Sequence, residues 1–244
     1  AATALVTFYT QRAVWLAPGM AGWTNGEAPF PFRYRALPMW IAQLGADALG
    51  PSRLPAIYFG IATLSAWGTL LACRELIATW LPRRLAAVLA LGVVFPLAWH
   101  YAILNNLYFP FDLPAVFLFT AGWLFCLRRV WWGYYAAFLL GCFNRETILF
   151  LSVLFGLTWF RRLRGRELAL HLAAQLLVYA AAKAVLREVF ASPEGSLFAT
   201  VWWKNRSTYL GLLTLRENGL KDWLKLLLAF GGFWWLLPFI WKRQ

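Results

Sequence analysis

Two mixed polar motifs interrupt the apolar runs in the middle of this 244-residue chain. The first is the Phe-Asp-Leu-Pro sequence around Asp112, and the second is the run Asn144-Arg145-Glu146-Thr147. Ionisable side chains cost about 2.5–3.5 kcal/mol each within a membrane on insertion scales, so those found at membrane depth are usually functional. We therefore take Asp112, Arg145 and Glu146 as candidate site residues. The structural alternative is that Arg145 and Glu146 satisfy each other or Asp112 inside the bundle.

A second group of candidates lies in a segment rich in Gly, Pro and aromatic residues. Glu27 is a candidate catalytic base, and Arg33-Tyr34-Arg35 is a candidate anion clamp, because guanidinium groups bind phosphate oxygens bidentately. Contact with lipid headgroups would explain both arginines without any substrate. Further along the chain, Lys204 and Arg206 stand beside two tryptophans, a combination that suits a sugar or a pyrophosphate. An aromatic belt at the membrane interface explains the same residues without a ligand.

The composition indicates the class of protein that must position these residues. The chain is 61% hydrophobic and 14% charged, whereas soluble domains carry roughly 45–50% apolar and about 25% charged residues. We therefore expect an all-α, polytopic transmembrane bundle, with residues 1–244 as a single domain that is trimmed at one or both ends. The net charge of +13 comes largely from short basic clusters between apolar runs, which argues against nucleic acid as a partner.

The hydrophobic runs predict about seven spans and one helix that lies in the membrane interface. The interfacial helix is 36–49, which is shorter than the roughly 20 residues that a span needs. The two short helices around Asn144–Thr147 would each reach only about 21 Å, which places their turn below the membrane surface, at the floor of a cavity. The predicted spans are 54–73, 85–104, 113–127, 130–143, 147–160, 168–186 and 223–241, with 1–18 as part of an uncertain first span and 19–35 and 187–222 as loops.

The basic turns predict the orientation of the chain in its membrane. Positively charged residues concentrate at Arg83-Arg84, Arg128-Arg129, Arg161–Arg166 and Lys242-Arg243, which all fall on one predicted face. Cytoplasmic loops carry an excess of Lys and Arg, so this face is expected to be cytoplasmic. The candidate site residues then share the opposite face. We expect a multi-pass protein of the bacterial inner membrane.

Three features together resemble the GT-C superfamily of integral membrane glycosyltransferases. They are an acid in an external loop (Glu27), an aspartate that opens a span (FDLPAVFLF), and a short Gly-rich helix that ends in a basic–acidic motif (NRET). The chain is similar, more narrowly, to bacterial membrane proteins with an "RYR" loop and a "K/R-E-T" hairpin. The resemblance covers roughly residues 24–160.

The resemblance implies sugar transfer from a polyprenyl-phosphate donor on the non-cytoplasmic side of the membrane. It implies Glu27 as the base and Arg33 and Arg35 as phosphate contacts, with Asp112, Arg145 and Glu146 lining the cavity. Asp112 is the second catalytic candidate, and the expected partners are membrane lipid and the lipid-linked donor. No cofactor or metal-ligand set is evident in the sequence, although a divalent cation could assist the transfer.

The chain departs from the GT-C pattern because its first loop lacks a paired Asp-Glu. We also expect no soluble C-terminal domain after the bundle. Two other functions therefore stay open. One is a non-catalytic accessory subunit that packs against other subunits of a larger membrane complex. The other is a transporter in which Arg145, Glu146 and Asp112 form an ion relay; the missing internal repeat counts against it.

Overall fold

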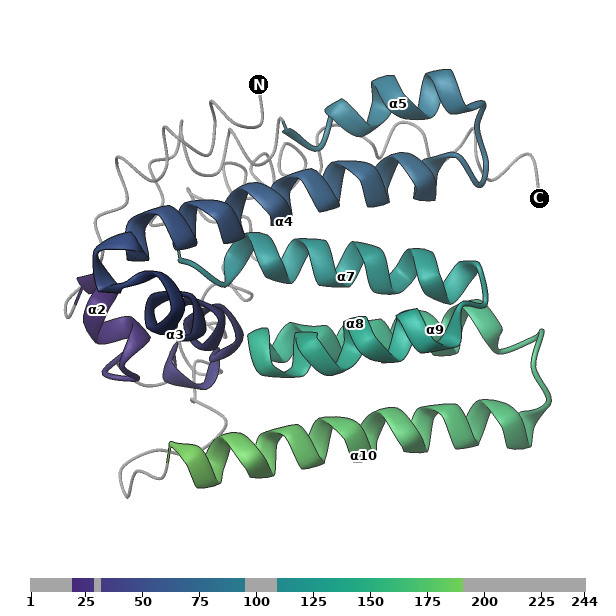
Figure 1. Ribbon diagram of the computed structural model, residues 1–244. Helices are drawn as coiled ribbons and strands as arrows, with labels where there is room; N and C mark the ends of the chain where they lie inside the picture. Colours follow the sequence, from purple (N-terminus) through teal and green to yellow (C-terminus); the bar gives the residue numbers. More distant parts are fainter. Residues whose placement is uncertain (1–18, 29–31, 95–108, 191–244) are drawn as a thin grey trace, which may run out of the picture.

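The computed structural model describes residues 19–28, 32–94 and 109–190, and these residues form helices without any strand (Figure 1). The expectation of an all-helical protein is confirmed for this part of the chain. The helices that follow one another are α4 (Leu54–Ile77), α5 (Arg83–Leu91), α7 (Asp112–Leu127), α8 (Trp131–Asn144), α9 (Phe150–Trp159) and α10 (Gly165–Val189). The predicted segments 1–18 and 223–241 lie outside the described residues, as do half of 85–104 and most of 187–222. The residues Lys204, Arg206, Lys242 and Arg243 are outside them too.

The long helices run back and forth across one bundle, as rows in Figure 1. Helix α7 packs between α4 and α8, while α10 packs against α8 and α9. Because consecutive helices reverse direction, α4 and α7 begin at the same end of the bundle at which α8 and α10 finish. The turns that link α4 to α5, α7 to α8 and α9 to α10 lie at the other end.

Two of the described helices are long and apolar enough to cross a membrane, Pro51–Ile77 and Gly165–Val189. Asp112–Leu127 and Glu146–Trp159 are apolar but shorter. On α4 and α10, large apolar side chains face outward, among them Leu64 (74% exposed) and Leu177 (70% exposed). Apolar surface of this kind is a feature of proteins whose surroundings are lipid or another protein.

The segment 19–35 is more ordered than the loop that its Gly and Pro content predicted. It contains the helix α2 (Gly19–Thr24) and the single 3-10 turn η1 (Phe32–Tyr34). Trp23 is 1% exposed and packs near the rings of Phe32, Phe109 and Phe111. Burial of these aromatic rings, which each remove a large apolar surface from water, outweighs the weak helix propensity of the segment.

A helix is present where the interfacial helix 36–49 was expected, as α3 (Leu37–Leu49). Pro38 occupies its first turn, where a missing backbone N–H is harmless. Gly50 has φ +92 and ends the helix in a conformation that favours glycine, and the 3-10 turn η2 (Pro51–Arg53) follows. Figure 1 shows α3 nearly end-on while α4, α7 and α10 run across the view, so α3 crosses the bundle direction at one end.

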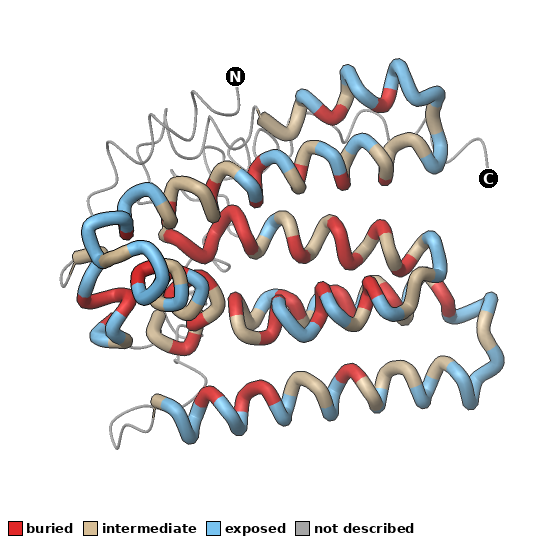
Figure 2. Tube along the Cα trace, in the orientation of Figure 1, coloured by how far each residue is buried: buried red, intermediate tan, exposed pale blue. Residues whose placement is uncertain are grey.

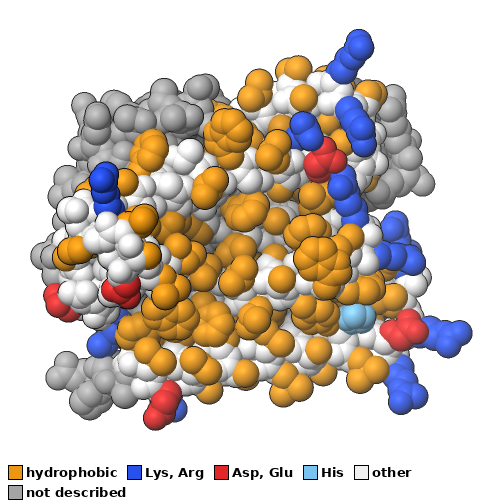
Figure 3. Space-filling model, in the orientation of Figure 1, with side chains coloured by type: hydrophobic (Ala, Val, Ile, Leu, Met, Phe, Trp, Pro, Cys, Tyr) orange, Lys and Arg blue, Asp and Glu red, His pale blue; other side chains and the backbone are white. Residues whose placement is uncertain are grey.

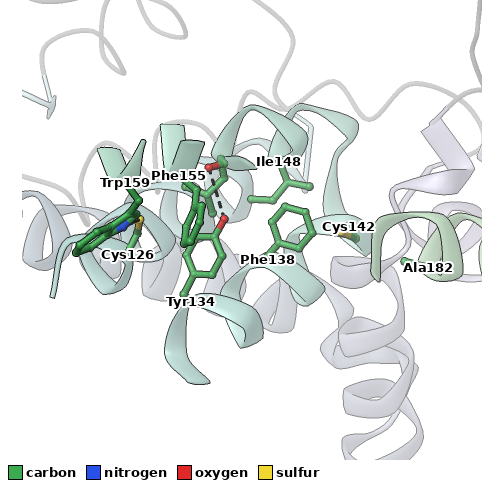
Figure 4. Close-up of a cluster of buried hydrophobic side chains, with 9 residues drawn as sticks. Cys126, Tyr134, Phe138, Cys142, Ile148, Phe155, Trp159 and Ala182 are labelled. Carbon is green, nitrogen blue, oxygen red and sulfur yellow. Dashed lines mark hydrogen bonds between the residues drawn. The ribbon is translucent and has the colours of Figure 1, made fainter. Parts of the chain in front are cut away.

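The Asn144–Thr147 hairpin folds as predicted, with a 3-10 turn, η4 (Glu146–Leu149), ahead of α9. Its helices supply most of the largest buried cluster, shown in Figure 4, in which Tyr134 and Phe138 of α8 face Phe155 and Trp159 of α9. Figure 2 shows buried residues concentrated along α7, α8 and α9 and exposed residues along α5 and α10. The Tyr134 hydroxyl donates to Gln175 Oε1 at 2.9 Å and so ties α10 to this core.

Basic residues gather at the end of the bundle formed by the α4–α5, α7–α8 and α9–α10 turns, at the right of Figure 3. The Arg128 guanidinium, in the turn after α7, links this turn to the last residues of α4, because its Nη2 lies 2.6 Å from Glu75 Oε2. The Arg129 guanidinium lies 4.7 Å from the centre of the Trp159 ring. The turns Arg83-Arg84, Arg128-Arg129 and Arg161–Arg166 therefore share one end, while Asp112 and Asn144–Thr147 lie at the opposite end.

Gly122 permits the close approach of α7 and α9, and its replacement tests this packing. A Cβ on Gly122 would lie 2.5 Å from Leu151 Cδ2, on a side chain that is fully buried. We expect Gly122→Ala to lower the free energy of unfolding in detergent by about 1–3 kcal/mol, the usual cost of overpacking. Gly60→Ala is the control, because a Cβ there meets nothing within 4 Å. Equal thermal stability of the two variants would contradict this account of the helix contact.

Candidate functional site

Five ionisable side chains from separate parts of the sequence converge at the end of the bundle opposite the basic turns. We call them the charged cluster: Arg35 ahead of α3, Asp112 at the start of α7, Arg145 at the end of α8, Glu146 in η4 and Lys183 on α10. The antiparallel order of the helices explains this convergence, because α7 begins where α8 and α10 end. Three of the five are cations and two are carboxylates.

Asp112 and Arg145 form the tightest ion pair of the charged cluster. Arg145 Nη1 donates to Asp112 Oδ1 at 2.9 Å. The Asp112 side chain is 12% exposed, and its second oxygen accepts the backbone N–H of Phe109 at 3.4 Å. Asn144, next to Arg145, is fully buried and donates from Nδ2 to the Phe111 carbonyl at 2.9 Å. These bonds attach the α8–η4 turn to the first turn of α7.

Glu146 lies between the two remaining cations but forms no short bond with either. Its Oε2 is 3.6 Å from Arg35 Nε, and its Oε1 is 3.8 Å from Lys183 Nζ. Both distances exceed that of a normal hydrogen bond. Lys183 Nζ also donates to the carbonyl of Cys142 at 3.4 Å. The single Glu146 carboxylate therefore partly balances the charge of two cations, at distances beyond a hydrogen bond.

Both of these cations are largely removed from solvent. The Arg35 side chain is 14% exposed, and its Cζ lies 4.4 Å from the centre of the Phe111 ring and 5.1 Å from that of Phe32. Burial lowers the pKa of the Arg35 guanidinium, although the Glu146 carboxylate acts in the opposite direction. The Lys183 side chain is 9% exposed. Charges in such places are normally paired, because an unpaired buried charge is costly.

The charge balance of the cluster makes it suited to an anion. Arg145 and Asp112 neutralise each other, which leaves Arg35 and Lys183 with the single carboxylate of Glu146. The cluster therefore carries a formal charge of +1. Within the residues that the structure describes, no group of three or more His, Cys, Asp or Glu side chains could hold a metal ion.

A small pocket, with room for about one water molecule, opens beside the Arg145–Asp112 pair, between α7 and the hairpin. Its lining is apolar except where the hairpin turn contributes Asn144, Arg145 and Thr147; the other lining residues are Ala115, Phe119, Gly141 and Ile148. The buried Asn144 Oδ1 accepts no hydrogen bond from any residue that the structure describes. The pocket is thus lined by apolar side chains on one side and by the Arg145 guanidinium and the Asn144 amide on the other.

The other predicted residues of the N-terminal segment lie near the charged cluster in the fold but do not enter it. Glu27 is exposed and pairs with no described cation, although its neighbour Ala28 packs in one apolar cluster with Phe111. The Arg33 side chain has a buried Nε with no hydrogen-bond partner among the described residues. Tyr34 is 3% exposed and lies edge-on to Phe190, in a mainly apolar environment. Lys204 and Arg206 lie outside the described residues.

Lys183 is the functional candidate that sequence reasoning missed. It stands in the apolar run Ala180–Leu186 of a predicted span, so the rarity of membrane-depth cations could have singled it out. Its partner was not deducible from spacing, because Lys183 and Glu146 are far apart in the sequence and meet only when α10 packs along α8.

The Arg145–Asp112 pair can be tested by a double-mutant cycle. Arg145→Met leaves a largely buried carboxylate without its main cation, so we expect a loss of about 1–3 kcal/mol in the free energy of unfolding. The double variant with Asp112→Asn should recover part of this loss, with a coupling energy of about 1 kcal/mol or more, measured by denaturation in mixed micelles.

The control cycle combines Asp112→Asn with Arg84→Met, which removes an exposed arginine at the far end of the bundle. Those two effects should add. Additive effects of Arg145→Met and Asp112→Asn would mean that the pair contributes nothing to stability.

Comparison of the chain with known protein families, with curated proteins and with solved structures gives no match.

Proposed function

We propose that this chain is an integral membrane glycosyltransferase that takes its sugar from a polyprenyl-phosphate donor. The observation that carries the proposal is the shortage of anionic partners for the charged cluster among the described residues. Arg35 and Lys183 share one carboxylate at 3.6 and 3.8 Å, and both side chains are largely buried. A phosphate that enters between them would supply the missing negative charge and accept short, charge-assisted hydrogen bonds.

A lipid-borne phosphate suits this position better than a soluble one. The cluster lies at the end of a bundle whose α4 and α10 have outward-facing apolar side chains. A ligand with a charged head and an apolar tail could place the head among the cations while the tail stays in an apolar environment. Lys204 and Arg206 are proposed as further contacts to the donor.

The proposal places the charged cluster on the non-cytoplasmic face of a bacterial inner membrane. Its support is the segregation of charge along the bundle, because the basic turns that favour the cytoplasm lie at the end opposite Asp112 and Glu146. The proposed architecture is a GT-C-like bundle of about seven spans with α3 in the interface. The two membrane-length helices and the crossing direction of α3 support it.

The proposed reaction joins an acceptor hydroxyl to the anomeric carbon of the sugar. Glu27 takes the hydroxyl proton as the acceptor oxygen forms its bond to that carbon. The bond between the carbon and the phosphate oxygen breaks, and its electron pair stays on the phosphate. Arg35 and Lys183 stabilise the negative charge that grows on this leaving group, in the manner of fixed cations at a developing anion. Exposure of Glu27 leaves it accessible to an acceptor.

Removal of the Arg35 charge tests the phosphate site. We expect Arg35→Gln to weaken the binding of a polyprenyl-phosphate sugar roughly 10- to 100-fold, the effect of losing a charge-assisted hydrogen bond. Binding would be measured in nanodiscs by displacement of a fluorescent lipid phosphate. Arg53→Gln is the matched control, because Arg53 is exposed at the same end of the bundle. Equal losses in both variants would indicate only general electrostatic attraction and reject the site.

Removal of the Glu27 carboxylate tests the assigned chemistry. We expect Glu27→Gln to lower kcat for release of polyprenyl phosphate by about 10²–10⁴-fold with little change in donor affinity, because a general base acts on the transition state. Asp47→Asn, an exposed acid on α3, should leave kcat unchanged. Full activity of Glu27→Gln would reject this residue as the base.

A further inference from the structure

Glu146 is a carboxylate inside a site whose proposed ligand is itself an anion. It approaches Arg35 and Lys183 from η4 and leaves a gap to each that is too long for a hydrogen bond. A carboxylate placed only to neutralise these cations would be expected at about 2.7–2.9 Å, as Asp112 is from Arg145. At these distances Glu146 lowers the net positive charge of the site, while the N–H donors of Arg35 and Lys183 stay available to a ligand.

We infer that Glu146 selects the charge of the bound lipid phosphate: it permits one negative charge and disfavours two. This inference rests on the proposed function. With Glu146 ionised, Arg35, Glu146 and Lys183 sum to +1, so a single negative charge brings the group to neutrality. A second negative charge on the ligand would lie unbalanced beside the Glu146 carboxylate. That carboxylate is 31% exposed but lies against the largely buried Arg35 and Lys183, so the repulsion is less screened than in bulk water.

The donor and the product of the proposed reaction differ in this charge. In the lipid-linked sugar the phosphate is a diester with one negative charge. When the bond to the sugar breaks, the phosphate keeps the electron pair and becomes a monoester, which carries about −1.5 to −2 at pH 7. Glu146 therefore favours the donor over the product and assists product release. It also disfavours lipid diphosphates, which carry at least two charges.

The ion pair between Arg145 and Asp112 does not change the net charge of +1 on Arg35, Glu146 and Lys183. Arg145 is bound at 2.9 Å by Asp112 and adds no net charge. The Tyr179 ring lies 5.5 Å from Lys183 Nζ and is uncharged at neutral pH. Among the described side chains that contact Arg35, Glu146 or Lys183, no further carboxylate takes part. The discrimination between one and two ligand charges therefore depends on Glu146.

The test compares three lipids of equal chain length: the sugar phosphodiester, the monophosphate and the diphosphate. Their Kd values would be measured in nanodiscs at fixed ionic strength and pH 7.5 for the full chain. We expect the wild type to bind the diester most tightly. In Glu146→Gln, affinity for the monophosphate and diphosphate should rise roughly 10- to 100-fold relative to the diester. Glu188→Gln, which removes the same charge from the exposed end of α10, should leave the ratios unchanged.

Glu146→Gln leaves Arg35 and Lys183 without a carboxylate and could therefore destabilise the fold. A double variant separates such a folding defect from a change in ligand selectivity. Glu146→Gln combined with Lys183→Gln returns the group to +1 and should restore the wild-type ratios. Unchanged ratios in Glu146→Gln, equal shifts in Glu188→Gln, or altered ratios in the double variant would each overturn the role of Glu146. Failure of the wild type to bind any of the three lipids would instead reject the proposed function.

Discussion

The ion pair between Arg145 and Asp112 determines how the two halves of the site meet. It joins the turn after α8 to the first turn of α7, and the Asn144 amide reinforces this link through the Phe111 carbonyl. With that turn held, Glu146 is presented toward Arg35 and Lys183 on the adjoining elements. The position of Glu146 between Arg35 and Lys183 thus depends on the Arg145–Asp112 pair, which itself carries no net charge.

Aromatic packing supports the same end of the bundle from the N-terminal side. The rings of Phe32, Phe109 and Phe111 lie nearly parallel, with centroids 5.0–6.0 Å apart, and Trp23 lies against them. Arg35 rests over two of these rings, so its guanidinium is held by its surroundings before any ligand arrives. A cation positioned in this way loses little conformational freedom on binding, which favours affinity for an anion.

The bundle separates its charges into two ends with different properties. At the basic end the arginines are exposed, and Glu75 pairs with Arg74 and Arg128 at 2.8 and 2.6 Å. At the other end, Arg35 and Lys183 are largely buried and share the Glu146 carboxylate at 3.6 and 3.8 Å. Exposed ion pairs contribute little to stability, and an effect of the basic end on membrane orientation is part of our proposal. A bound anion is our proposed explanation for the incomplete pairing of Arg35 and Lys183.

The sequence by itself determined the helical class, the hairpin around Asn144–Thr147 and the breaks at Gly50 and the arginine doublets, because these follow from local periodicity and turn residues. It also singled out Asp112, Arg145 and Glu146, because ionisable groups are conspicuous in apolar runs. Only the tertiary structure decided that Asp112 pairs with Arg145 and that Lys183 shares Glu146 with Arg35. Those partners lie on different helices, and their meeting depends on helix order and packing, which no local pattern encodes. The helix α2 was missed for the same reason, since Trp23 is buried by residues that follow it by more than eighty positions.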